Sequence, residues 1–340
     1  MSSNNIQKSV ISYNDTVSSL NFCKTNQNLL ISSSWDGTIT ILEDPNYSLA
    51  KGSFSFQDEE TKMPLPILYA DFIQNSESQI ISLDIENTLR LSNISQNKSS
   101  SLSLPINSQI FNISQVYNSS SNFILFDREQ NIYNYDIRTK NNCNVQTKTE
   151  RQITSAKTFN NMIITGDIQQ ITFYDNRAMD KSILTINHHL NGSEITSLEY
   201  IENESVILGG AEGKIAVEYL DSSKGKSYSF KCHRIEESES IKLYAVNSII
   251  YDNKRKIYFS GGSDGYIYGW DYIKRKKVFK SEKEKNAIVG LDTNKDKTKL
   301  AYAVSYLYED GNFEEESNKS KDNNFINIIN EVEFFISQKK

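Results

Sequence analysis

Few side chains in this sequence have the chemistry for catalysis or metal binding. The three histidines are His188, His189 and His233. Because His188 and His189 are adjacent, a strand would point them to opposite faces of a sheet, which is poor geometry for holding one metal ion. The sequence also shows no Cys/His pattern of acyl transfer, no P-loop and no dinucleotide fingerprint. We therefore expect no enzyme, no resident metal ion and no cofactor.

The three cysteines, Cys23, Cys143 and Cys232, lie far apart in the sequence. No two of them have the CxxC spacing of a zinc site, and three scattered cysteines do not suggest a disulfide framework. We expect free thiols.

Composition points to a soluble β-protein. The hydrophobic fraction is only 37%, whereas Tyr (19) and Phe (16) are frequent, which favours short strands joined by polar turns. A net charge of −6 argues against binding a nucleic-acid backbone but leaves room for a small basic site. No apolar run approaches the ~18 residues of a membrane helix, and the start MSSNNIQKSV does not resemble a signal peptide. We therefore expect an intracellular protein without a membrane or nucleic-acid partner.

One unit recurs along the chain: an apolar-alternating strand, a polar turn, a second strand ending in small residues, a turn that usually carries an acidic residue, and a third strand. The clearest copies span residues 16–42 and 245–271. Successive turns lie about 39 to 52 residues apart, which brackets the ~40–45 residues of a four-stranded WD40 blade, and Asp-Gly turns suit tight hairpins at positive φ. The predicted turn positions are Asp36, Glu86, Glu129, Ile168, Glu212 or Gly213, and Asp264.

Seven such units predict a single all-β, seven-bladed propeller domain over residues 1–340. Packing the blades radially would bury sheet faces that one blade cannot bury alone. We expect the strand around Ile6–Ile11 to complete the last blade beside residues 325–330. The charged stretch 308–324 and the polar stretch Ser95–Ser103 are expected to be connecting loops. The predicted blades lie near residues 12–50, 62–97, 107–140, 150–180, 192–232, 243–280 and 286–335.

Several segments carry more information than the repeat itself. They are SWDG at residues 34–37, AVEYLD at 216–221 with FKCHR at 230–234, AVNSI at 245–249 leading into GGSDG at 261–265, and AVSYLYED at 303–310. Together they resemble the spindle-checkpoint WD40 propellers of the Bub family. The resemblance is strongest in the first blade and over residues 193–310.

This resemblance implies a non-enzymatic adaptor of the spindle assembly checkpoint. Propellers of the family bind a short motif of the checkpoint kinase and of its pseudokinase relative along their top face. They also recognise threonine-phosphorylated Met-Glu-Leu-Thr repeats of the kinetochore scaffold. The implied location is the nucleus, and in mitosis the kinetochore.

By motif position, the resemblance assigns phosphate recognition to Lys214 and Lys231, and peptide packing to Trp35. A phosphothreonine brings about −1.5 to −2 charges, which paired cations can hold with charge-assisted bonds. Yeast relatives commonly carry arginine at the two lysine positions. Because lysine lacks the planar fork of arginine, we expect weaker or more permissive phosphate binding. The alternatives are solvated lysines and a Trp35 ring packed within the propeller.

Further positions follow from the same comparison. Arg234 is a candidate supporting cation. We expect its neighbour His233, and also Asp264, to have structural roles. Arg128, also a candidate supporting residue, stands where relatives place a second top-face tryptophan. Thr196 or a neighbour replaces an arginine that relatives use. These departures affect how the kinase motif would dock.

Two other functions are compatible with parts of the sequence. The AVEYLD and FKCHR pair also marks the messenger-RNA export propeller of the nuclear pore, although SWDG and the last-blade segment favour the checkpoint family. An enzyme or an unrelated ubiquitin-ligase scaffold would need residues that the sequence does not display. The basic run at residues 274–277 is expected to be a solvated turn, with nuclear import as its alternative.

Overall fold

In the computed structural model, the chain divides into two compact units. The described residues are 6–44, 50–116, 119–139, 143–236, 240–307 and 324–330, without the side chains of residues 6–10, 103 and 144. The first unit comprises Met1–Ile85, Arg90–Ser100 and Ile250–Lys340, and the second comprises Glu86–Leu89 and Ser101–Ile249.

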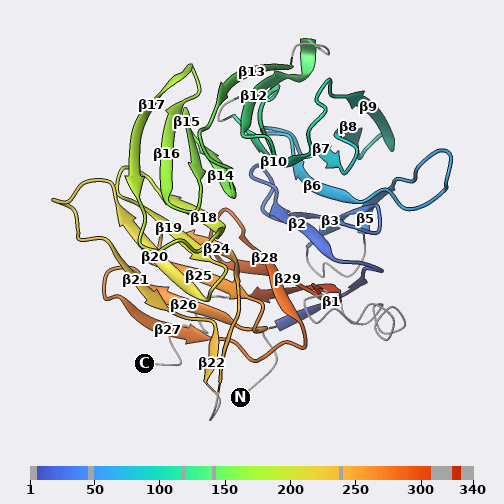
Figure 1. The fold of residues 1–340 in the computed structure, drawn as a ribbon. Helices are drawn as coiled ribbons and strands as arrows, with labels where there is room; N and C mark the ends of the chain where they lie inside the picture. Colours follow the sequence, from blue (N-terminus) through green and yellow to red (C-terminus); the bar gives the residue numbers. More distant parts are fainter. Residues whose placement is uncertain are drawn as a thin grey trace. The chain divides into compact units, whose positions relative to one another are not determined.

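The described residues form seven four-stranded sheets and one two-stranded hairpin (Figure 1). The 3₁₀ segment η2 (Ile137–Thr139) is the sole helical element among them. Within these ranges, therefore, no helix has the length or the hydropathy to cross a membrane. The predicted fold class, an all-β protein of seven blades, is confirmed.

Four of the sheets lie wholly or largely in the first unit. In their spatial order they are β1 (Ile6–Ser12), β30 (Phe325–Asn330), β29 (Lys299–Ser305) and β28 (Ala287–Thr293); β2 (Val17–Phe22), β3 (Leu29–Ser34), β4 (Thr38–Glu43) and β5 (Ala50–Ser55); β6 (Ile67–Phe72), β7 (Gln79–Asp84), β8 (Thr88–Asn93) and β9 (Lys98–Ser103); and β24 (Val246–Asp252), β25 (Ile257–Gly262), β26 (Ile267–Asp271) and β27 (Lys276–Lys280).

The second unit contains the other three sheets and the short hairpin. They are β10 (Ile110–Gln115), β11 (Asn122–Asp127), β12 (Asn131–Asp136) and β13 (Cys143–Lys148); β14 (Ser155–Phe159), β15 (Met162–Gly166), β16 (Gln170–Asp175) and β17 (Ala178–Asn187); β18 (Ile195–Ile201), β19 (Ser205–Gly210), β20 (Lys214–Tyr219) and β21 (Tyr228–Lys231); and the hairpin β22 (Arg234–Glu236) with β23 (Ile241–Leu243).

Burial explains why the second strand of a blade does not alternate in polarity. Strands β3, β19 and β25 are buried at every position, and their sequences are LLISSS, SVILGG and IYFSGG. A strand covered on both faces needs a continuous apolar or small run instead of alternation. The fourth strands β5 and β17 are mostly exposed. Within each unit, apolar side chains of adjacent sheets form the core between them.

The turns that carry the candidate residues fall where the repeat predicts them. All six predicted turn positions lie in the hairpins between the second and third strands of their sheets. Gly37 and Gly265 have φ values of +80° and +76°, which confirms the expected positive φ at both Asp-Gly turns. In the first of them, the Asp36 carboxylate accepts hydrogen bonds from the backbone and hydroxyl of Thr38. These six blades therefore each present a turn at the same end of the sheet.

The N-terminal strand pairs with the C-terminal one, as predicted. Strand β1 is antiparallel to β30, with Ile6 opposite Ile329 and Ser12 opposite Phe325. Before β30, the buried Asn324 accepts a hydrogen bond from the backbone N–H of Tyr13 at 2.9 Å. The rest of the stretch predicted as a charged loop, residues 308–323, lies outside the described residues.

The prediction that Ser95–Ser103 is a connecting loop is wrong. Lys98–Ser103 forms β9, the fourth strand of its sheet. The chain turns at Asn97, whose φ is +48°, and the Ser92 and Ser99 hydroxyls then bond across the two strands at 2.9 Å. An exposed edge strand is stabilised by backbone pairing and does not need apolar alternation, so its sequence gives little signal.

A pair of glycine substitutions tests how tightly the first turn is packed. At Gly37 a Cβ would lie 2.5 Å from the Phe56 carbonyl oxygen, whereas at Gly192, with φ of +82°, it would meet nothing within 4 Å. Both Gly→Ala changes carry the cost of a positive φ, about 1–2 kcal/mol, and Gly37→Ala adds a backbone clash. We expect urea unfolding to show a clearly larger loss of stability for Gly37→Ala. Equal losses would contradict the packing of this turn.

Candidate functional site

The two candidate lysines lie directly opposite each other in one hairpin. Strands β20 and β21 are antiparallel, and their register pairs Lys214 with Lys231. The adjacent pair is hydrogen-bonded, because the N–H of Cys232 donates to the carbonyl of Gly213 at 2.9 Å. The lysine pair is therefore of the non-hydrogen-bonded type, whose Cα atoms lie only about 4.5 Å apart. Both side chains point to the same face of the sheet.

This arrangement concentrates positive charge at the end of the hairpin. The Lys214 side chain is 24% exposed, and Lys231 is exposed to solvent. Like charges directly opposite on a sheet destabilise it. A bound dianion would relieve that repulsion and accept hydrogen bonds from both ammonium groups. The structure thus brings the two lysines together in a geometry suited to an anion.

A third residue belongs to this site that sequence reasoning had named only as a turn position. Glu212, in the turn before β20, places its carboxylate 2.8 Å from the Lys214 ammonium, and its side chain is 52% exposed. Lys231 makes no ion pair within the described part of the chain. Glu212 stands two positions before Lys214, a spacing that could have signalled the contact.

Gly213 fixes the turn against the end of β21. Its φ is +64°, and a Cβ there would lie 2.8 Å from the carbonyl oxygens of both Cys232 and His233. A side chain at this position would push the two strands apart. Only glycine therefore allows the approach that keeps Lys214 opposite Lys231.

Arg234 begins the short hairpin that follows the lysine pair. It pairs with Leu243 in the β22–β23 register, and its half-buried side chain has a buried Nε without a hydrogen-bond partner among the described residues. The preceding His233 is 1% exposed and has a φ of +37°. This burial fits the structural role expected for His233, while the supporting role of Arg234 stays a prediction.

Arg128 belongs to a different sheet from the lysine pair. It is exposed in the turn between β11 and β12, where its guanidinium carbon lies 5.0 Å from the centroid of the Phe111 ring. Its neighbour Asp127 anchors this turn, because the carboxylate accepts hydrogen bonds from the backbone of Glu129 and Asn131 at 2.9 and 2.8 Å. Nothing in this geometry assigns Arg128 to phosphate binding.

Asp127 is the charged centre of that turn. Burial raises the pKa of its carboxyl, but hydrogen bonds from Ser108, Asn131 and Tyr133 outweigh burial and hold the pKa below its ordinary value. The Tyr133 hydroxyl and the Asn131 amide both donate to Oδ2 at 2.8 Å. The folded turn therefore stabilises the ionised carboxylate of Asp127 over its protonated form.

Trp35 lies in the first unit, in the turn between β3 and β4. Its backbone N–H donates to Thr16 at 2.9 Å, while its indole is 43% exposed. The large exposed area argues against the alternative of a ring packed inside the core. Exposed rings of this size are favoured contacts for a bound peptide.

The remaining candidates have structural partners. The Thr196 hydroxyl donates to Val246 at 2.7 Å and to Gly209 at 3.1 Å. In the turn between β25 and β26, Asp264 is 3% exposed and accepts a hydrogen bond from the backbone of Tyr266 at 3.2 Å. These bonds support the structural role expected for Asp264.

The histidines and cysteines do not converge on one centre. His188 and His189 follow β17 instead of lying on a strand, and they contact the Asp167 carbonyl at 3.0 Å and the Glu218 carboxylate at 2.8 Å, respectively. Among the described residues, no group of three histidine, cysteine or acidic side chains could hold a metal ion. All three cysteines are free, and burial raises the pKa of the Cys143 thiol to about 11, which disfavours its nucleophilic thiolate.

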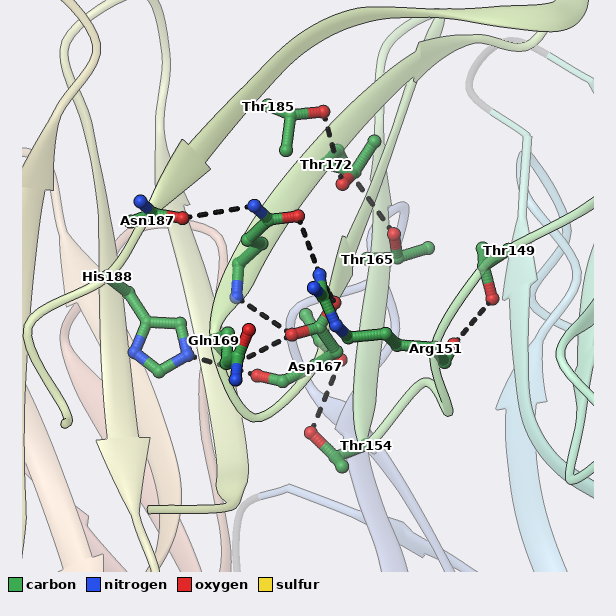
Figure 2. Close-up of polar contacts among 12 residues, drawn as sticks. Thr149, Arg151, Thr154, Thr165, Asp167, Gln169, Thr172, Thr185, Asn187 and His188 are labelled. Carbon is green, nitrogen blue, oxygen red and sulfur yellow. Dashed lines mark hydrogen bonds and ion pairs between the residues drawn. The ribbon is translucent and has the colours of Figure 1, made fainter. Parts of the chain in front are cut away.

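A cavity of about 380 Å³ lies between the β10–β13 and β14–β17 sheets of the second unit. Its lining carries charges of both signs, from Lys148 and Arg151 to Asp167 and Asp180. Figure 2 shows that several of the polar groups bond to each other: the Thr149 hydroxyl donates to the Arg151 carbonyl at 2.7 Å, and the Thr185 hydroxyl donates to Thr172 at 3.4 Å. In addition, Arg151 donates to Gln170 and Gln170 donates to Asn187, each at 3.0 Å. Because the lining charges of this cavity have both signs, the lysine pair is the better anion site.

Comparison with known proteins adds independent evidence. The "WD domain, G-beta repeat" family model matches residues 6–41. The mitotic checkpoint protein bub3 of Dictyostelium discoideum is 26% identical over 328 residues, which cover 93% of each chain. The mitotic checkpoint protein bub-3 of Caenorhabditis elegans is 30% identical over 146 residues, covering 42% of this chain and 43% of the worm protein. Arabidopsis thaliana BUB3.1 is 32% identical over 137 residues, 39% of each chain.

Messenger-RNA export proteins match a shorter part. The mRNA export factor GLE2 of Chaetomium thermophilum is 27% identical over 114 residues, 33% of this chain and 32% of that protein. The seven four-stranded sheets and the WD-domain match define the class, a WD40-repeat β-propeller. Within this class, the similarities support a mitotic checkpoint WD40 protein of the Bub3 type, which confirms the resemblance drawn from the sequence.

The hydrogen bonds to the Asp127 carboxylate, in the turn that carries Arg128, can be tested through their pH dependence. In Asp127→Asn, an amide N–H₂ replaces an oxygen that accepts from Tyr133 and Asn131, so we expect a loss of about 1–3 kcal/mol in the free energy of unfolding at neutral pH. Because folding lowers the pKa of this carboxyl, its stabilisation is present above about pH 4 and is lost as the pH falls further. The difference between wild type and variant should therefore shrink in acid.

Denaturation at several pH values measures this difference. The exposed Asp180→Asn in the same unit removes an equal charge and should leave stability nearly unchanged. A difference for Asp127→Asn that grows in acid would show that the sign of the pKa shift is wrong.

Proposed function

We propose that this protein is a spindle assembly checkpoint adaptor that binds phosphorylated Met-Glu-Leu-Thr repeats of the kinetochore scaffold and recruits Bub-family checkpoint kinases. The similarity to mitotic checkpoint Bub3 proteins supports the general role. The single observation that carries the finer proposal is the placement of Lys214 directly opposite Lys231.

The chemistry of the lysine pair suits a phosphothreonine. At neutral pH the phosphate carries about −1.5 to −2 charges and three acceptor oxygens, so it can receive bonds from both ammonium groups. An unphosphorylated threonine offers neither the negative charge nor the three phosphate oxygens. Lysine binds phosphate as a point charge and tolerates a range of oxygen positions, in contrast to the fixed fork of arginine. The site should therefore require phosphate while remaining permissive about the angle at which it enters.

Kinase recruitment in this proposal uses the exposed Trp35 ring of the first unit, which would pack on the bound peptides. An exposed indole beside a rigid hydrogen-bonded turn can bury a large area against a peptide with little loss of conformational freedom. The proposed partners are the short motifs of the checkpoint kinase and its pseudokinase relative. In this role the protein has no substrate to turn over, and it acts in the nucleus and at kinetochores during mitosis.

A charge-reversal experiment tests phosphate recognition. Fluorescence polarisation with a labelled Met-Glu-Leu-Thr peptide should show tighter binding when the threonine is phosphorylated. Reversing both charges, in Lys214→Glu with Lys231→Glu, should weaken phosphopeptide binding at least tenfold, because each charge-assisted bond contributes about 1.5–3 kcal/mol.

The matched control is Lys224→Glu with Lys226→Glu. These lysines lie in the turn at the opposite end of the β20–β21 hairpin, so net charge changes equally while the site stays intact. Equal weakening by the two double variants, or none by either, would refute the assigned site.

Truncation of the indole tests the kinase-binding surface. Trp35→Ala should weaken binding of a peptide carrying the checkpoint kinase's motif by about 30-fold, the effect of a 2 kcal/mol interface hot spot. Isothermal titration calorimetry measures the affinity, and Met63→Ala serves as control because Met63 is a 64% exposed apolar side chain of the same unit. Unchanged affinity in Trp35→Ala would exclude this ring from the interface.

A further inference from the structure

One of the two phosphate-site lysines is already occupied by an internal anion. The Glu212 carboxylate lies 2.8 Å from the Lys214 ammonium. A phosphate held between the opposed lysines would need the same ammonium protons. Carboxylate and phosphate therefore compete for Lys214.

The surroundings of Glu212 allow the competition to be reversible. Its side chain is 52% exposed and can turn into water when it releases Lys214. The backbone below it does not follow, because Gly213 is packed against the carbonyl oxygens of Cys232 and His233. Displacing Glu212 thus costs an exposed ion pair and leaves the hairpin in place.

The two lysines consequently differ in how accessible they are to an incoming phosphate. Lys231 is exposed and makes no ion pair within the described residues, whereas Lys214 is shielded and paired. An incoming phosphate can contact Lys231 first and then exchange with the Glu212 carboxylate at Lys214. The exchange replaces one negative charge by about two, so the second step favours a phosphate dianion.

We propose that Glu212 is an autoinhibitory residue that lowers the affinity of the lysine pair for phosphorylated peptides by competing for Lys214. This inference rests on the proposed phosphopeptide function. It assigns to Glu212 the role of keeping phosphate binding weak enough for the phosphorylated peptide to dissociate.

The test is phosphopeptide binding to Glu212→Gln, which removes the charge and keeps the side-chain size. Affinity for the phosphothreonine Met-Glu-Leu-Thr peptide should rise about two- to fivefold, the range of one exposed ion pair. In a Lys214→Gln background, Glu212→Gln should have a much smaller effect, because the pair no longer exists. Glu202→Gln, exposed in the turn between β18 and β19, controls for net charge and should leave affinity nearly unchanged.

Each outcome is decisive. A fall in affinity would mean that Glu212 positions Lys214 for the phosphate, and an unchanged affinity would mean that it has no role; both overturn the proposal. A similar rise in Glu202→Gln, or a rise that persists without Lys214, would assign the effect to overall charge. If the wild type does not distinguish phosphorylated from plain peptide, the proposed function itself fails, which is a separate result.

Discussion

The register of β20 against β21 is the constraint on which the candidate site depends. Antiparallel pairing puts Lys214 opposite Lys231, although sixteen other residues separate them along the chain. A shift of one residue would place one of the two lysines on the other face of the sheet. Gly213 secures the register, because its lack of a Cβ lets the turn pack against the end of β21. Two like charges placed opposite each other repel, so an anion bound between them would stabilise the hairpin.

The division between rigid sheets and exposed turns explains where the chemistry lies. Inner strands such as β3 and β19 are buried on both faces and contribute packing. The turns that follow such strands carry residues that differ from blade to blade: Trp35 after β3, Arg128 after β11 and Glu212 after β19. Because the buried strands beneath are held on both faces, each turn can differ in chemistry without altering the fold.

Much of the fold could be predicted from the sequence because its signals are local and repeated. Positive-φ glycines after acidic residues mark the hairpins at Gly37 and Gly265, and small residues at strand ends mark the buried second strands. The strand β9 was missed because an exposed edge strand owes its stability to backbone pairing. For the site, motif resemblance located the lysine pair and Trp35. It could not reveal Glu212, whose role depends on a 2.8 Å contact.

The central claim, that the opposed lysines bind one phosphate together, is tested most directly by NMR of the lysine side chains. The protein would carry ¹³C-dimethyl labels on its lysines and be titrated with the phosphothreonine peptide. We predict that the Lys214 and Lys231 signals move with a common midpoint while those of Lys224 and Lys226 stay in place. Saturable binding that leaves both Lys214 and Lys231 unmoved would contradict the account.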